Sequence, residues 1–83
     1  MTVHVRLFAA FRELAGASHV EATGRTAGEI GDALSAVHGE RFAAIAAVSS
    51  FVVNGERAER GTPVADGDEV AILPPVSGGR DPG

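Results

Sequence analysis

The residues with the clearest chemical potential lie at the end of the sequence, where Leu73-Pro74-Pro75-Val76-Ser77 leads into Gly78-Gly79. Proline has no N–H to donate, so a paired strand stops at Pro74 and a stiff, extended stalk begins there. Glycine has no Cβ, so the backbone of the Gly78-Gly79 pair can enter a channel too narrow for any side chain. This combination predicts an arm that is threaded into a partner's active site. The alternative is an ordinary glycine-rich chain end.

The other polar side chains do not form a reactive group that we can recognise. The three histidines lack the spacing of a ligand pair and no cysteine accompanies them, so we expect no metal site. The acidic residues around Gly67 fit a solvated turn better than a calcium loop, which needs more oxygen ligands. We therefore expect the chain to have no catalytic residues of its own.

Composition narrows the possible partners. The chain has 83 residues, enough for one small domain, and its formal net charge is −4. This acidic balance argues against nucleic acid and against anionic membranes, because both are bound by basic surfaces. All seven basic residues are arginine, so the chain has no lysine amine. The first residues lack the apolar core of a signal peptide, and we expect a cytoplasmic protein.

The first half of the chain predicts two strands. Val3, Val5 and Leu7 alternate with residues that face the other way, which indicates a half-buried strand. We expect a turn or a short helical turn over Ala9–Gly16, followed by a hairpin partner strand over Ser18–Ala22.

The main helix is predicted over Ala27–His38. Thr26 and Glu29 form a capping box at its start, and Gly39 is expected to end it in a left-handed conformation. Its apolar residues recur at the spacing of one buried stripe, made of Ile30, Ala33, Leu34 and Val37.

The second half of the chain predicts three further strands separated by turns. We expect a loop with a short helical turn over Phe42–Val48, strands over Phe51–Val53, Glu56–Ala58 and Glu69–Leu73, and turns at Asn54-Gly55 and Asp66-Gly67-Asp68. The economical architecture is α+β, a mixed sheet of about five strands with one main helix packed across it. The domain would occupy residues 1–74 and a tail residues 75–83.

Four segments together carry a family resemblance. The chain resembles the ubiquitin-like sulfur-carrier proteins of β-grasp fold, which include the small subunit of molybdopterin synthase and the thiamine-pathway carrier. The Pro-Pro-Val-Ser-Gly-Gly ending is most similar to the molybdopterin synthase small subunit. The matching segments are Leu7-Phe8-Ala9 with Arg12-Glu13-Leu14-Ala15-Gly16, then Val53-Asn54-Gly55-Glu56, Asp66-Gly67-Asp68-Glu69-Val70, and Leu73 to Gly79.

The resemblance implies a mechanism centred on Gly79. An adenylyltransferase of the ubiquitin-activating type would adenylate the Gly79 carboxylate, and a sulfur donor would displace AMP to leave a thiocarboxylate. The large subunit of molybdopterin synthase, or another acceptor enzyme, would then take the sulfur. ATP and Mg²⁺ would be supplied by the activating partner, so the chain itself would bind no cofactor.

The alternation along the first and last strands, which the family fold implies are neighbours, predicts a docking surface near the root of the tail. Phe8, Ala71 and Leu73 are expected on one outward face, although scattered exposed apolar residues are also normal. The tail residues Pro74, Pro75, Val76 and Ser77 would continue this contact. The family often has an apolar residue after the Asn54-Gly55 turn. This chain has Arg57, which we expect to pair with an acidic residue of the partner.

The chain departs from the family pattern after the second glycine, because Arg80-Asp81-Pro82-Gly83 follows Gly79. An amide at Gly79 cannot be adenylated as a free carboxylate can. We therefore expect cleavage between Gly79 and Arg80, by a zinc-dependent peptidase of the deubiquitinase type. The alternative is an inert tail.

Three other functions remain open at this stage. The carrier could serve another pathway, for cysteine, thiamine or a sulfur-containing natural product. The chain could be a ubiquitin-like modifier joined to lysines of other proteins. It could also be a plain interaction domain with an inert tail.

Overall fold

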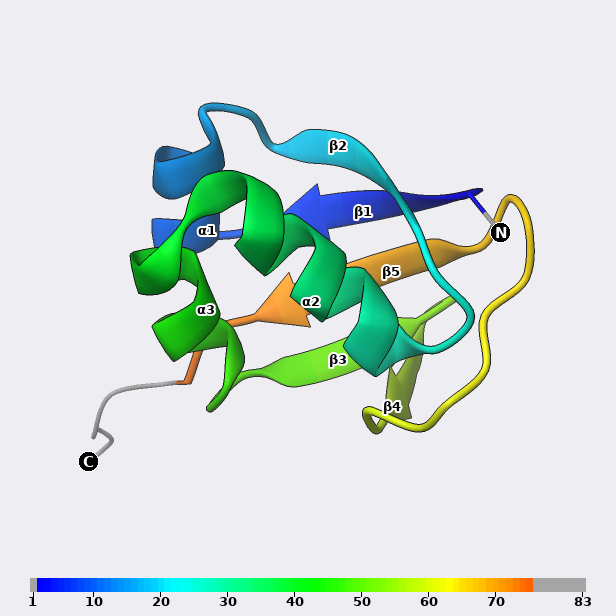
Figure 1. The fold of residues 1–83 in the computed structure, drawn as a ribbon. Helices are drawn as coiled ribbons and strands as arrows, with labels where there is room; N and C mark the ends of the chain where they lie inside the picture. Colours follow the sequence, from blue (N-terminus) through cyan, green and yellow to red (C-terminus); the bar gives the residue numbers. More distant parts are fainter. Residues whose placement is uncertain (1, 76–83) are drawn as a thin grey trace.

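The computed structural model describes residues 2–75 of the chain. Its elements are β1 (Thr2–Leu7), α1 (Ala10–Ala15), β2 (His19–Thr23), α2 (Ala27–His38), α3 (Glu40–Ala46), β3 (Ser50–Val53), β4 (Glu56–Ala58) and β5 (Glu69–Leu73). The strands form one sheet in the order β2-β1-β5-β3-β4, in which β1 and β5 are parallel and the other neighbours antiparallel. In Figure 1, α2 and α3 lie in front of the sheet, and α1 lies at the left beside α3. This confirms the expected α+β architecture.

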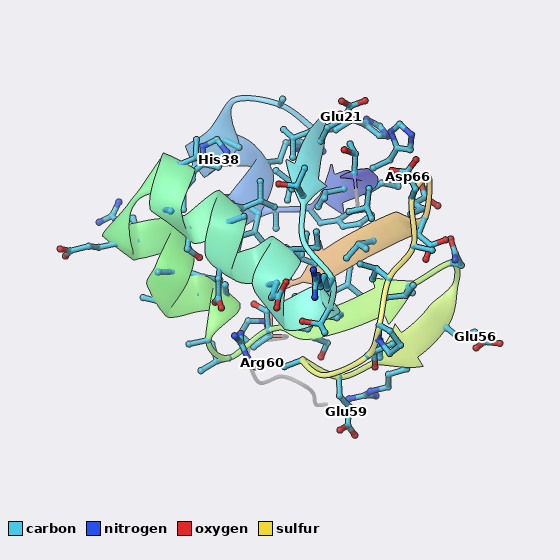
Figure 2. The ribbon with its side chains drawn as sticks, turned by 45° about the vertical axis from the view of Figure 1, so that its right-hand side comes forward. Glu21, His38, Glu56, Glu59, Arg60 and Asp66 are labelled. Carbon is cyan, nitrogen blue, oxygen red and sulfur yellow. The ribbon has the colours of Figure 1, made fainter. Side chains whose placement is uncertain are left out.

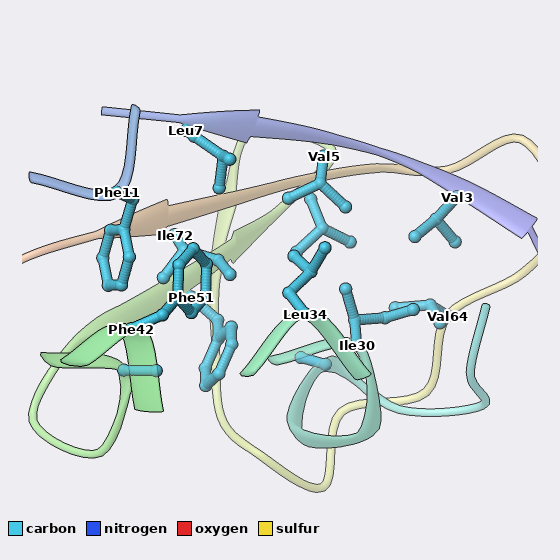
Figure 3. Packing of buried hydrophobic residues seen from close by; sticks show 13 residues of the cluster. Val3, Val5, Leu7, Phe11, Ile30, Leu34, Phe42, Phe51, Val64 and Ile72 are labelled. Carbon is cyan, nitrogen blue, oxygen red and sulfur yellow. The ribbon is translucent and has the colours of Figure 1, made fainter. Parts of the chain in front are cut away.

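The core lies between the sheet and the helices (Figure 3). The alternation predicted for the first strand is confirmed, because Val3, Val5 and Leu7 are buried and the residues between them exposed. In β5, Val70 and Ile72 point to the same side and are 0% exposed. The two strands are in parallel register, with Val5 opposite Val70 and Leu7 opposite Ile72. These pairs form the centre of the domain.

The predicted bounds of α2 are confirmed, and so is the cap at its start. The Glu29 N–H donates to Thr26 Oγ1 at 3.2 Å, while Glu29 Oε1 accepts the Arg25 N–H at 2.8 Å. The left-handed conformation expected at Gly39 is wrong. Its φ of 101° is positive, but its ψ of −175° is extended, and the chain passes directly into α3.

The apolar stripe predicted for α2 is wrong at Val37, whose side chain is 75% exposed. The helix instead turns two glycines toward the body, so that its buried residues are Ala27, Gly28, Ile30, Gly31 and Leu34. A Cβ at Gly31 would lie 3.2 Å from a ring carbon of Phe51. The space that a side chain at position 31 would occupy is therefore filled by the Phe51 ring.

The loop with a short helical turn predicted over Phe42–Val48 is wrong in extent, because the helical part is the seven-residue helix α3, which includes most of this segment. Phe42 is 0% exposed, and its ring centroid lies 4.7 Å from that of Phe11 in α1. The alanines of this segment have high helix propensity, and the Phe42 contact fixes the helix against the core. By contrast, the short helical turn expected over Ala9–Gly16 is confirmed as α1.

The two predicted turns are both present and are linked to each other. Asn54 and Gly55 have φ angles of 51° and 85°, as a tight hairpin turn requires. The Asn54 N–H donates to the Glu69 carbonyl at 2.8 Å, and Asn54 Oδ1 accepts the Glu69 N–H at 3.0 Å. In the second turn, Asp68 Oδ2 accepts the Ala65 N–H at 2.8 Å. These contacts fix the start of β5.

We expect Phe42→Ala to lower the free energy of unfolding by about 3–5 kcal/mol, because it leaves a cavity beside Phe11. Val48→Ala is the control, since Val48 is 65% exposed and should change stability by less than about 0.5 kcal/mol. Urea denaturation followed by circular dichroism measures both values. Equal effects of the two changes would contradict the position of α3.

Stability should also depend on Asp68 at acid pH. The Ala65 N–H, and after it the Asn54 side chain, lowers the pKa of Asp68 below its ordinary 3.8. A lowered pKa contributes stability at neutral pH that is lost as the pH falls through 3.8 and below. Urea titrations at several pH values should therefore show that the free energy of unfolding decreases less steeply at acid pH in Asp68→Asn than in the original chain. If the free energy of unfolding decreases equally with falling pH in both proteins, the Asp68 carboxylate does not contribute to stability.

Candidate functional site

One face of the sheet is not covered by a helix, and we call it the open face. The strand registers place twelve side chains on it, three from each of β1, β2 and β5, two from β3 and one from β4. The set is His19, Glu21 and Thr23 of β2, Thr2, His4 and Arg6 of β1, Glu69, Ala71 and Leu73 of β5, Ser50 and Val52 of β3, and Arg57 of β4.

The open face is charged on one side. His4 Nδ1 lies 3.6 Å from Glu21 Oε2, and Arg6 Nε lies 3.9 Å from Glu69 Oε2. Figure 2 shows Glu21 extending from β2 into solvent. Exposed pairs of this kind contribute about 0–1 kcal/mol, so they do little to hold the strands together. They set the charge pattern that a partner would meet.

The other side of the open face is apolar and adjoins the root of the tail. A hollow of about 250 Å³ is lined there by Ser50, Val52, Arg57, Leu73, Pro74 and Pro75. Val52 lies opposite Ala71 on one side and Arg57 on the other. The hollow therefore combines apolar walls with one cationic side chain.

The predicted outward placement of Ala71 and Leu73 is confirmed. Both are half-buried, while their neighbours Val70 and Ile72 are fully enclosed on the helix side. Phe8 follows the end of β1 and is also half-buried. The Arg6 guanidinium carbon lies 5.6 Å from the centre of the Phe8 ring, which places Phe8 on the open-face side.

Sequence reasoning did not select Val52 or Ser50, although both line the hollow. The signal was present, because Phe51 is the inward residue of β3 and its neighbours must face the opposite side. Arg57 is exposed at the rim of the hollow, as its position after the turn suggested.

Several predicted site residues lie outside the described residues. These are Val76, Ser77, Gly78, Gly79 and Arg80. The structure does fix where the tail begins, because β5 is paired with β1 on one side and with β3 on the other. Pro74 thus starts from a central strand, beside the hollow.

Within residues 2–75, no three His, Asp or Glu side chains gather closely enough to hold a metal ion. No helix in the same part of the chain is long and apolar enough to cross a membrane. What the described residues offer is a contact surface and a fixed origin for the tail.

The family model that matches the chain is described as the ThiS family, and the match covers residues 5–79. The chain is 37% identical over 84 residues to small archaeal modifier protein 1 of Haloferax volcanii, which covers 89% of this chain and 97% of that protein. A crystal structure of that modifier has a TM-score of 0.76, with 34% identity over 95% of this chain and 100% of the other.

Two other solved structures carry different functional names. A molybdopterin converting factor subunit 1 structure from Pyrococcus furiosus has a TM-score of 0.79 and 29% identity, covering 92% of this chain and 99% of that chain. A chain in the crystal structure of the Amycolatopsis orientalis BexX/CysO complex has a TM-score of 0.76 and 31% identity, covering 93% and 99%. These likenesses confirm the ubiquitin-like β-grasp fold.

Two adjacent residues of β5 test whether the open face is needed for stability. Ile72→Ala should lower the free energy of unfolding by about 2–5 kcal/mol, since it empties a fully buried site. Leu73→Ala should cost about 1 kcal/mol, because this side chain is only half-buried. Chemical denaturation of both variants gives the comparison. If Leu73→Ala is as costly as Ile72→Ala, Leu73 belongs to the core and not to a contact surface.

Proposed function

We propose, since the chain belongs to the ThiS family of ubiquitin-like sulfur carriers, that it carries sulfur as a thiocarboxylate on Gly79. We propose that the sulfur is used to make molybdopterin. The observation that carries the first proposal is the family match, which runs from residue 5 to the second glycine of the pair at residue 79. The Pro-Pro-Val-Ser-Gly-Gly ending and the likeness to a molybdopterin converting factor subunit support the second.

The chemistry requires only a free carboxylate from this chain. A carboxylate oxygen of Gly79 attacks the α-phosphate of ATP, pyrophosphate leaves, and an acyl-adenylate forms. A sulfide then attacks the carbonyl carbon and displaces AMP, which leaves the thiocarboxylate. If the donor is a persulfide, a second thiol must break the S–S bond and is oxidised to a disulfide. The adenylyltransferase of the ubiquitin-activating type supplies ATP and Mg²⁺.

The open face is the proposed docking surface for both the activating and the accepting partner. Its hollow adjoins Pro74 and Pro75, so a partner that seats against Leu73 and Val52 receives the tail in a fixed direction. Pro74 and Pro75 restrict the backbone, which lowers the entropy lost when the tail is threaded. The acceptor that we propose is the large subunit of molybdopterin synthase.

The residues after Gly79 must be removed before this chemistry can begin. Gly79 is followed by Arg80, so its carbonyl is part of an amide. Hydrolysis of the Gly79–Arg80 bond consumes one water and releases the free carboxylate. We propose that a zinc-dependent peptidase of the deubiquitinase type performs this step.

A second candidate function is protein modification. The observation in its favour is the 37% identity to small archaeal modifier protein 1. A modifier uses the same activated carboxylate, but a lysine amine of a target protein attacks it instead of a sulfide. The likeness to a chain of the BexX/CysO complex similarly favours sulfur delivery to a pathway other than molybdopterin. Lysine-linked adducts in the cell, or binding of a different acceptor enzyme, would identify these alternatives.

The Gly79→Pro variant tests the role of the second glycine. Proline would add a ring where the partner channel requires bare backbone, and a misplacement of this size lowers activity about a hundredfold. The assay uses a chain that ends at residue 79, mixed with the adenylyltransferase of the same cell and ATP, and measures pyrophosphate release. Val48→Ala, an exposed position outside the open face and the tail, is the control and should stay within about twofold.

The same variant in the longer form, with residues 80–83 present, should resist cleavage after position 79. Mass spectrometry of the protein from cells reports both cleavage and loading. Thiocarboxylate on the Gly79→Pro variant would contradict the proposed chemistry.

A further inference from the structure

A second groove lies on the helix side of the sheet, between β2 and α2. Its volume is about 390 Å³, and its lining is Thr2, Glu21, Ala22, Thr23, Ala33, Leu34 and Val37. Val37 and Val48 are the two large apolar side chains that are mostly exposed within residues 2–75. The exposed Val37 thus lies at a groove that the proposed function does not use.

The strand beside this groove has free hydrogen-bonding groups. β2 is the edge strand of the sheet, and its only strand neighbour in the described part of the chain is β1. The Leu7 N–H donates to the Ser18 carbonyl, so Ser18, Val20 and Ala22 direct their backbone groups toward β1.

The backbone N–H and C=O groups of the alternate residues point away from the sheet. These residues are His19, Glu21 and Thr23, and no loop or side chain within residues 2–75 forms a hydrogen bond with their backbone. A row of free N–H and C=O groups on three alternate residues is what an added strand needs for pairing.

The side-chain alternation then determines what the added strand must carry. Val20 and Ala22 face the helix side, and Glu21 faces the open face opposite His4. A residue paired directly with Glu21 places its side chain beside that carboxylate. Its two neighbours in the added strand point toward Leu34 and Val37, into the groove.

We propose that the β2–α2 groove binds an extended peptide segment of a partner protein, which pairs with β2 and carries the pattern apolar–basic–apolar. The basic residue would lie directly opposite Glu21, where opposite charges across strands are favourable. Glu21 is the one charged residue in the groove lining, and the whole chain has a net charge of −4. Both observations favour a basic peptide over an acidic one.

The other edge of the sheet offers no comparable site. β4 has only three residues, and the hollow beside it is lined by charged and polar residues that include Asn54, Glu56 and Asp68. A second copy of the chain, paired symmetrically about Glu21, would bring two carboxylates opposite each other. A separate basic segment is therefore the occupant that fits the groove.

The proposed contact lies at the β2 edge and leaves the hollow beside β5 and the tail root free, because β2 and β5 are separated by β1. A partner could therefore hold the domain through β2 while another enzyme works on the tail. This inference does not depend on the chemistry of Gly79, so its failure and the failure of the proposed function are distinguishable.

The test is selection from a display library of random twelve-residue peptides, with the full chain as bait. We expect enrichment of the pattern apolar–basic–apolar. A Glu21→Lys bait should instead select apolar–acidic–apolar. No enrichment, or the same pattern with both baits, would overturn the proposal.

One enriched peptide is then synthesised and titrated into the ¹⁵N-labelled full chain. The largest amide shifts should fall on β2 and on α2 near Val37. Val37→Glu should weaken binding about tenfold or more, since it places a charge in an apolar contact. Val48→Glu, the matched change at the other exposed valine, should stay within about twofold.

Circular dichroism must show that both variants are folded. Shifts confined to the open face, equal affinities of the two variants, or self-association through β2 in sedimentation would each overturn the proposal.

Discussion

The parallel pairing of β1 with β5 is the interaction on which the rest of the structure depends. It places the first and last strands side by side at the centre of the sheet, with Val5 opposite Val70 and Leu7 opposite Ile72. Since β3 pairs with the other edge of β5, the last strand is held from both sides. The tail therefore begins at the central strand of the sheet, which is paired on both sides.

A domain of this size must build its core from few residues, and this accounts for several local features. Gly31 allows the Phe51 ring to reach the helix, and Phe42 closes the core against Phe11. The helices pack against one face of the sheet and leave the other face uncovered (Figure 1). Ala71, Leu73 and Val52 consequently remain on the uncovered side, where they are available for contacts with other proteins.

The sequence predicted those features that depend on local patterns. The alternation in β1 and β5, the cap at Thr26 and the turn at Asn54 arise from neighbouring residues, and each was confirmed. The segment containing α3 was misjudged, because its anchor is the contact of Phe42 with a ring about thirty positions earlier. Val37 was misplaced because glycines, which carry no apolar signal, occupy the buried face of α2.

The candidate site shows the same division. The alternation of inward and outward residues along β5 was sufficient to place Ala71 and Leu73 outward. The hollow beside them could not be predicted in this way, because it depends on how β3 and β4 are paired with β5 and with each other.

The central claim, sulfur carriage on Gly79, is tested most directly by the intact mass of the untagged protein from its native cells. The account predicts a species that ends at Gly79 and is heavier by the replacement of one oxygen with sulfur. A full-length, unmodified protein in cells that are making the cofactor would contradict it.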